Sequence, residues 1–88
     1  MNYMANNRKR FNNKINISSD MIRKYRELNN LSREELSTKL MLEGIDISAQ
    51  SIANIENGFR TIVDYELCGI AKVLKVEVAL LLKEYYNK

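Results

Sequence analysis

Apolar side chains recur every three or four residues along most of the chain after residue 20. This spacing gathers them on one face of an α-helix, whereas a half-buried strand would alternate apolar and polar residues. The pattern predicts helices over about residues 20–29, 33–43, 49–56 and 77–86, and one that begins near Asp64 and reaches about Leu74. Proline, the strongest helix breaker, is absent. The chain is therefore expected to fold as a compact all-α domain of five helices without a sheet.

The predicted helix ends carry local chemistry that supports them. Ser32 followed by Glu35 has the form of a capping box, and Ser48 offers an N-cap to the third helix. Gly44 can close the second helix in a left-handed conformation, and Asn57-Gly58 can terminate the third. Asn-Gly is also typical of a hairpin turn, but neither flank alternates as strands would. The helical interpretation is therefore favoured.

The chain has room for one domain and one modest core, because it holds 88 residues of which 45% are hydrophobic. In the last two helices we expect inward positions at Leu67, Ile70, Ala71, Leu74, Val78, Leu81, Leu82 and Tyr85. Cys68 is expected on the core side of the fourth helix, buried or half-buried like a small apolar residue.

Composition argues against several classes of function. A single cysteine cannot form an internal disulfide, and the absence of histidine removes the commonest metal ligand and general base. No metal site, cofactor or small-molecule site is indicated, and an enzyme is the least favoured class. No apolar run approaches the roughly 18 residues of a membrane span, and the basic N-terminus lacks the apolar stretch of a signal peptide. The cytoplasm is the expected compartment.

Positive charge is concentrated in the first third of the chain. Up to residue 26 there are seven basic residues and one acidic residue, whereas the remainder has seven basic and ten acidic residues. Residues 1–17, here called the N-terminal arm, lack a helical period, so we expect a flexible arm followed by a domain over residues 18–88. The cations of the arm are Arg8, Lys9, Arg10 and Lys14. They indicate either a solvated tail or a segment that contacts nucleic acid, and charge alone does not distinguish the two.

The third predicted helix has two chemically different faces. Gln50, Ser51 and Asn54 fall within about 100° of one another around its axis, and Ile52 and Ile55 lie on the other side. An ordinary surface helix would also show a polar face. A helix that reads DNA needs this division, because its apolar side attaches it to the domain while its amides reach base edges. Gln and Asn match the donor and acceptor that adenine presents in the major groove.

Three separated segments resemble the Cro-repressor family of helix-turn-helix proteins, also called XRE-type. They read RKYRELNNLSREELSTKL, ISAQSIANIENGFR and DYELCGIAKVLKVEVALLL, and together they span about residues 20–82. The most specific piece runs from Ser48 to Gly58 and is similar to the family's recognition helix and its closing turn. The resemblance implies a lambda-repressor-like DNA-binding domain.

The resemblance also implies roles for individual residues. The positions that match base contacts are Ala49, Gln50, Ser51 and Asn54. The positions that match phosphate contacts are Ser32, Arg33, Asn57 and Arg60. The free amides and dipole at the start of the second helix would favour an anion, to which Arg33 adds a full charge. Arg26 and Glu56 match a partly buried ion pair between the first and third helices, although both could simply be solvated.

The connection between the second and third helices departs from the usual family pattern. It is commonly very short, whereas here residues 41–46 lengthen it, as in a subset of the family. An extra turn on the second helix that ends at Gly44 would accommodate these residues. The tilt of the third helix is the property that this insertion leaves open.

The leading interpretation is a bacterial or phage transcriptional regulator that binds duplex DNA by sequence and acts as a repressor. One module of this size buries little surface, so two copies are expected to bind an inverted-repeat operator together as a homodimer. The alternative is a protein-interaction module on the same fold, such as an antitoxin or anti-regulator, with the Tyr- and Leu-rich C-terminus as its contact.

Overall fold

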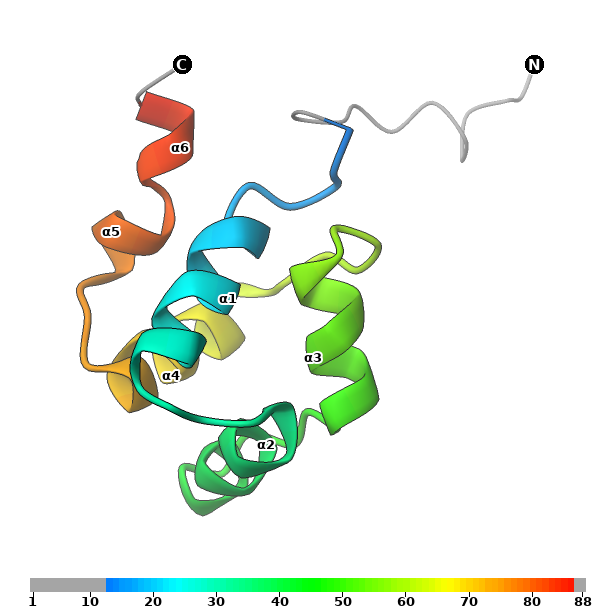
Figure 1. The fold of residues 1–88 in the computed structure, drawn as a ribbon, viewed down its shortest axis with the longest axis vertical. Coiled ribbons are helices and arrows are strands. Elements are labelled where there is room, and N and C mark those ends of the chain that lie inside the picture. Colours follow the sequence, from blue (N-terminus) through cyan, green and yellow to red (C-terminus); the bar gives the residue numbers. More distant parts are fainter. Residues whose placement is uncertain (1–12, 87–88) are drawn as a thin grey trace.

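The computed structural model describes residues 13–86, and these form a single helical domain (Figure 1). Its helices are α1 (Ser19–Leu28), α2 (Arg33–Leu42), α3 (Ala49–Glu56), α4 (Asp64–Leu74), α5 (Val78–Leu81) and α6 (Lys83–Tyr86). Within this part of the chain no residue belongs to an extended strand. The expectation of an all-α domain is confirmed.

The predicted fifth helix is divided into two short ones. The helix is interrupted at Leu82. The backbone hydrogen bonds around this position join residues three apart, with the amide of Leu82 donating to Ala79 O and that of Tyr85 donating to Leu82 O. Such bonds are typical of tight 3₁₀ turns rather than of a continuous α-helix. Leu81 is fully buried, whereas Tyr85, which we expected inside, is 52% exposed. The last turn therefore lacks the core contact that would hold a longer helix in place.

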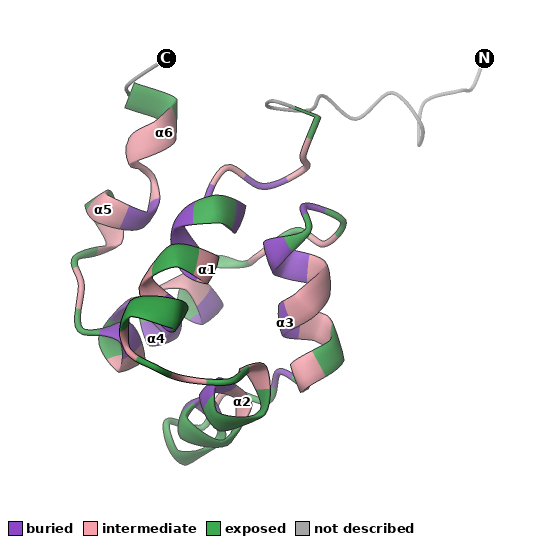
Figure 2. Ribbon diagram, in the orientation of Figure 1, coloured by how far each residue is buried: buried purple, intermediate pink, exposed green. Residues whose placement is uncertain are grey.

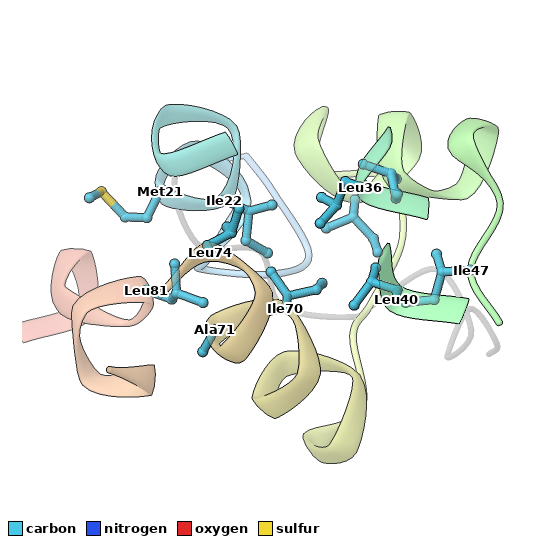
Figure 3. Close-up of a cluster of buried hydrophobic side chains, with 11 residues drawn as sticks. Met21, Ile22, Leu36, Leu40, Ile47, Ile70, Ala71, Leu74 and Leu81 are labelled. Atoms are coloured by element: carbon cyan, nitrogen blue, oxygen red, sulfur yellow. The ribbon is translucent and has the colours of Figure 1, made fainter. Parts of the chain in front are cut away.

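The core lies where α1, α2, α3, α4 and α5 converge (Figure 3). Its buried apolar members are Met21, Ile22, Leu36, Leu40, Ile47, Ile52, Ile55, Ile70, Ala71, Leu74 and Leu81. Figure 2 shows that the buried residues of α1 and α4 face the interior of the domain, while much of α2 is exposed. Among the helices, α2 and α3 contact each other most extensively, and both contribute side chains to this core.

Cys68 is exposed, which corrects the expectation that it would lie on the core side of α4. The helix turns by about 100° per residue, so a residue two positions before Ile70 lies on nearly the opposite side of the helix. Ile70 is fully buried, and Gly69 is also buried beside Ile45. The apolar face of α4 therefore leaves Cys68 outside.

The first four helices end in similar left-handed turns. The residues with positive φ at these turns are Asn30, Gly44, Gly58 and Lys75. In the turn after α2, the amide of Gly44 donates to Met41 O and that of Ile45 donates to Leu40 O, which is the pattern of a Schellman motif. The connection to α3 is then anchored by buried Ile47, whose carbonyl accepts a hydrogen bond from Ser37 Oγ at 2.6 Å. The lengthened connection is thus a capped helix end followed by an anchored segment.

Residues 13–17 lie against the domain, although the sequence pattern places them in the flexible arm. The amide of Ile15 donates to Gly58 O at 3.1 Å, and Asn16 is buried between α1 and the end of α3. Asn16 is polar, so the spacing of apolar residues does not predict that it is buried. Its Nδ2 instead donates to two backbone carbonyls that are distant in sequence, and its Oδ1 accepts from the amide and the hydroxyl of nearby Ser18.

Gly58 is expected to tolerate a side chain less well than Gly44. Both have φ near +80°, where a Cβ costs about 1–2 kcal/mol. A Cβ at Gly58 would also lie 2.4 Å from Lys14 Cγ, whereas a Cβ at Gly44 would meet nothing within 4 Å. Gly58→Ala should therefore lower the free energy of unfolding by more than Gly44→Ala, as measured by urea denaturation. Equal losses would mean that the segment at Lys14 does not press on the turn.

Candidate nucleic-acid interface

Helix α3 presents a short polar face to solvent and an apolar face to the core. Gln50 is exposed, Ser51 and Asn54 are half-buried, and Ile52 and Ile55 are fully buried. The Gln50 amide donates to Asn54 Oδ1 across one turn at 3.3 Å. Ala49 is half-buried at the start of the helix. The uncharged side chains on this face are therefore accessible while the helix itself is fixed by its buried side.

The start of α3 is capped by a side chain rather than left open. Ser48 Oγ accepts a hydrogen bond from the amide of Ser51 at 3.0 Å, and the hydroxyls of these two serines lie 3.1 Å apart. An N-cap of this kind satisfies one of the free amides of the first turn. Ser51 therefore already has a local partner, and its hydroxyl would exchange or share that contact on binding a ligand.

Glu56, at the end of α3, is fully buried and is surrounded by three arginines from two other helices. Arg26 of α1 forms a bidentate pair with it, at 2.6 Å from Nε to Oε2 and 3.0 Å from Nη2 to Oε1. Arg33 of α2 donates from Nε to Oε1 at 3.1 Å, and the Nε of Arg23 lies 3.6 Å from the same oxygen. One carboxylate thus joins α1, α2 and α3, and Glu56 together with these three arginines is here called the Glu56 cluster.

The hydrogen bond to Glu56 raises the pKa of Arg26 above its usual value, although burial acts in the opposite direction. Arg26 also donates from Nη1 to the carbonyl of Leu31 at 2.8 Å, in the connection that leads to α2. Among the described residues, no buried side-chain nitrogen or oxygen lacks a hydrogen-bond partner. A bidentate, fully satisfied pair of this kind restricts the orientation of α3 relative to α1.

Two of the positions expected to contact phosphate, Ser32 and Arg33, precede Glu56 in the sequence, and the other two follow it. Ser32 forms the expected capping box, with its Oγ accepting from the amide of Glu35 and the Glu35 carboxylate accepting from the amide of Ser32. Arg33 keeps 36% of its side chain exposed while it pairs with Glu56. The start of α2 and the end of α3 are therefore brought together by the same carboxylate.

Asn57 and Arg60, in the loop after α3, already have partners in the domain. Asn57 Oδ1 accepts a hydrogen bond from Arg23 Nη2 at 2.7 Å. The Arg60 guanidinium makes a bidentate pair with Glu66 of α4, at 3.1 and 3.0 Å, and 33% of its side chain is exposed. This pair positions the Arg60 side chain but also neutralises its charge, so its electrostatic contribution to a phosphate contact would be reduced.

Sequence reasoning did not identify Arg23 as part of this surface. Arg23 donates to Asn57 and lies beside Glu56, and 37% of its side chain is exposed. It is three residues before Arg26, so the two share a face of α1. That spacing was the available indication, but the partner of Arg23 follows α3 and is separated from it by 34 positions.

The cations of the N-terminal arm divide into two groups. Arg8, Lys9 and Arg10 lie outside the described residues. Lys14 is described, and its ammonium pairs with the Asp20 carboxylate at the start of α1. Its charge is therefore partly neutralised within the domain. Lys14 thus adds less to the positive charge of the N-terminal arm than the count of basic residues suggests.

The described residues include no group of three or more Cys, Asp or Glu side chains that could hold a metal ion. No helix in residues 13–86 is both long and apolar enough to cross a membrane.

A family model described as helix-turn-helix matches residues 22–81, which is more than half of the chain. The chain belongs to the Cro/XRE-type helix-turn-helix family. Searches among curated proteins and among solved structures gave no match. The matched region begins within α1 and ends at the last residue of α5, so it includes the α2–α3 unit and the Glu56 cluster. This helix-turn-helix domain is that of a DNA-binding regulator. Members of the family are generally not enzymes.

The Arg60–Glu66 pair predicts a pH dependence of the stability of this helix-turn-helix domain. The hydrogen bonds from Arg60 hold the pKa of Glu66 below its usual 4.5, against the opposing effect of burial. A carboxylate with a depressed pKa in the folded state stabilises the fold above its unfolded pKa, and this contribution is lost as pH falls through the folded pKa. We expect the free energy of unfolding to decline below about pH 4.5, and less steeply in Glu66→Gln. Urea titrations at several pH values would test this, and parallel declines would contradict it.

Proposed function

We propose that this protein is a sequence-specific transcriptional regulator that acts as a repressor in the cytoplasm. In this proposal α3 enters the major groove, with Gln50 and Asn54 reading bases and Ala49 and Ser51 close to them. The observation that carries the proposal is the rigid attachment of α3, whose exposed polar face lies opposite two fully buried isoleucines and next to the Glu56 cluster. A base-reading helix needs this restriction, because hydrogen bonds to base edges require a fixed orientation.

The phosphate contacts would come from both sides of that helix. Arg33 at the start of α2 and Arg23 beside Asn57 each keep more than a third of the side chain exposed. Arg60 and Ser32 would add contacts at the two ends of the same surface. These contacts hold the domain in register on the duplex, while the α3 side chains supply sequence preference.

We further propose that two copies act together on an inverted-repeat operator. The domain has 74 described residues and one α3 helix. A single module of this kind buries too little surface for tight specific binding, and two-fold symmetric sites are the common solution. Occupation of such an operator would block access of polymerase to the promoter.

Selection from random duplexes with the full-length chain would test this function. Enrichment of an inverted repeat, with the half-sites about one helical turn apart, is the expected result. The selected duplex placed upstream of a reporter should then lower its transcription. Failure to retain any duplex over the scrambled pool, at low salt as well as high salt, would reject the proposal.

The second candidate is a protein-interaction module on the same fold. It is favoured by the absence of charge on the exposed face of α3 and by two exposed tyrosines at the end of α6. Tyr85 and Tyr86 are 52% and 74% exposed, and their rings lie edge to face with 5.3 Å between the ring centroids. Salt dependence separates the two functions, because phosphate binding weakens steeply with salt whereas an apolar protein contact does not.

A further inference from the structure

The side chain of Asn16 makes four hydrogen bonds within the domain. Its Nδ2 donates to Ile55 O at 3.1 Å and to Arg60 O at 2.8 Å. Its Oδ1 accepts from the amide and the hydroxyl of Ser18, at 3.0 and 2.9 Å. The residue is only 8% exposed. An ionised aspartate of the same shape would have no donor for the two carbonyls, so this arrangement requires the amide.

Both carbonyls belong to the end of α3 and the connection that leads from it to α4. Ile55 is in the last turn of α3, where carbonyls lack partners within the helix, and Arg60 is in the connection itself. Between them, Gly58 O accepts from the amide of Ile15 at 3.1 Å. Figure 1 shows the segment before α1 running past this connection. The segment therefore holds the backbone after α3 at three points.

The same connection carries two of the positions proposed to contact phosphate. Asn57 is exposed, and Arg60 keeps 33% of its side chain exposed. Hydrogen bonds with Arg23 and Glu66 orient these two side chains. Asn16 acts at a different level, because it holds the backbone from which both side chains extend.

We propose that Asn16 is a positioning residue that fixes the connection after α3 in the conformation that brings Asn57 and Arg60 to the phosphates. This inference rests on the proposed function. Asn16 precedes residue 22, where the family match begins, so a residue outside the matched region supports the phosphate-contacting surface. Asn16 itself contacts no DNA in this proposal. A connection that is already fixed in the free protein need not be ordered on binding, and the loss of this preorganisation weakens binding.

Amide hydrogen exchange on the free, full-length chain tests the positioning without DNA. The amides of Gly58 and Phe59 donate to Ile55 O and Asn54 O in the turn after α3. In Asn16→Ala their exchange should accelerate by about tenfold more than that of an amide within α3, the factor expected for the loss of about one hydrogen bond. The comparison within one protein removes the effect of any overall loss of stability.

A double-mutant cycle in DNA binding tests whether this positioning serves the phosphate contacts. The duplex is the one obtained from the selection above. In the parent, N57A/R60A should weaken binding by about tenfold or more, as expected for lost hydrogen bonds to charged phosphates. In the Asn16→Ala background the same double substitution should cost less than about threefold, because the contacts are already impaired. The folded fraction of each variant is measured by circular dichroism under the binding conditions.

Base preference provides a second readout. Gln50 is in the first turn of α3, at the opposite end from the carbonyl that Asn16 holds. Asn16→Ala should therefore weaken binding to the operator and to a scrambled duplex by the same factor, since phosphate contacts carry no sequence information.

Asn29→Ala is the matched control. The Asn29 amide also donates to two backbone carbonyls, Tyr25 O at 2.8 Å and Leu74 O at 3.1 Å, but it joins α1 to the end of α4. Its loss should destabilise the fold in a similar way and leave the cost of N57A/R60A unchanged. If Asn16→Ala does not fold, Ser18→Ala is the milder variant, because it removes only the hydroxyl that donates to Asn16 Oδ1.

The outcomes separate this inference from the proposed function. Unchanged exchange in the turn after α3 would overturn the positioning role whether or not the protein binds DNA. An equal cost of N57A/R60A in the parent and Asn16→Ala backgrounds would overturn its part in binding while leaving the proposed function intact. A parent protein that binds no duplex would reject the proposed function and the inference together.

Discussion

Glu56→Ala should lower the free energy of unfolding by about 3–5 kcal/mol, the loss expected when one partner of a buried ion pair is removed. Glu56 is fully buried, and only 10% of the Arg26 side chain is exposed. The substitution would leave Arg26 buried without its carboxylate and would place Arg23 and Arg33 near it with no compensating charge. Urea denaturation followed by circular dichroism measures the loss.

Glu43→Ala is the control for this prediction. Glu43 pairs with Lys72 at 2.8 Å, but the two side chains are 34% and 70% exposed. Exposed pairs contribute about 0–1 kcal/mol, so this variant should remain close to the parent. A loss below about 1 kcal/mol in Glu56→Ala would contradict the organising role of the Glu56 cluster. Glu56→Gln retains most of the side-chain volume and would show how much of the effect belongs to the charge.

Gln50→Ala should weaken binding to the selected operator by about 1–3 kcal/mol and relax the base preference at one position of each half-site. Gln50 lies in the first turn of α3, where a recognition helix comes closest to base edges, and its side chain is exposed. Its amide can donate one hydrogen bond to adenine and accept another. Titration of the variant against the operator and against single-base variants would measure both effects.

Arg33→Ala should give a different result in the same assay. A phosphate contact carries no sequence information, so this variant should bind all duplexes more weakly and lower the salt slope by about one unit. Because Arg33 also pairs with Glu56, the folded fraction of the Arg33→Ala variant must be measured before its binding is compared. If Gln50→Ala binds operator and scrambled duplex as the parent does, α3 does not read bases. The protein-interaction function would then be the better explanation.

Much of the fold could be predicted from local patterns. The capping box at Ser32 and the left-handed turn at Gly44 each depend on residues within a few positions of one another, and both are present in the structure. The apolar period placed α1 to α4 within a few residues of their observed ends. It was less reliable at the C-terminus, where Leu81 is the one expected inward position of α5 and α6 that is fully buried and the helix is divided at Leu82.

The sequence by itself determined that the chain is helical, where most helices begin and end, and that α3 has one polar and one apolar face. These properties follow from side-chain spacing and capping, which act over one or two turns. Only the tertiary structure decided that Arg23 and Arg33 converge with Arg26 on Glu56, and that Asn16 holds the turn after α3. The partners in these contacts are 23 to 44 positions apart. Their meeting depends on how the buried faces of the helices pack, which no local pattern specifies.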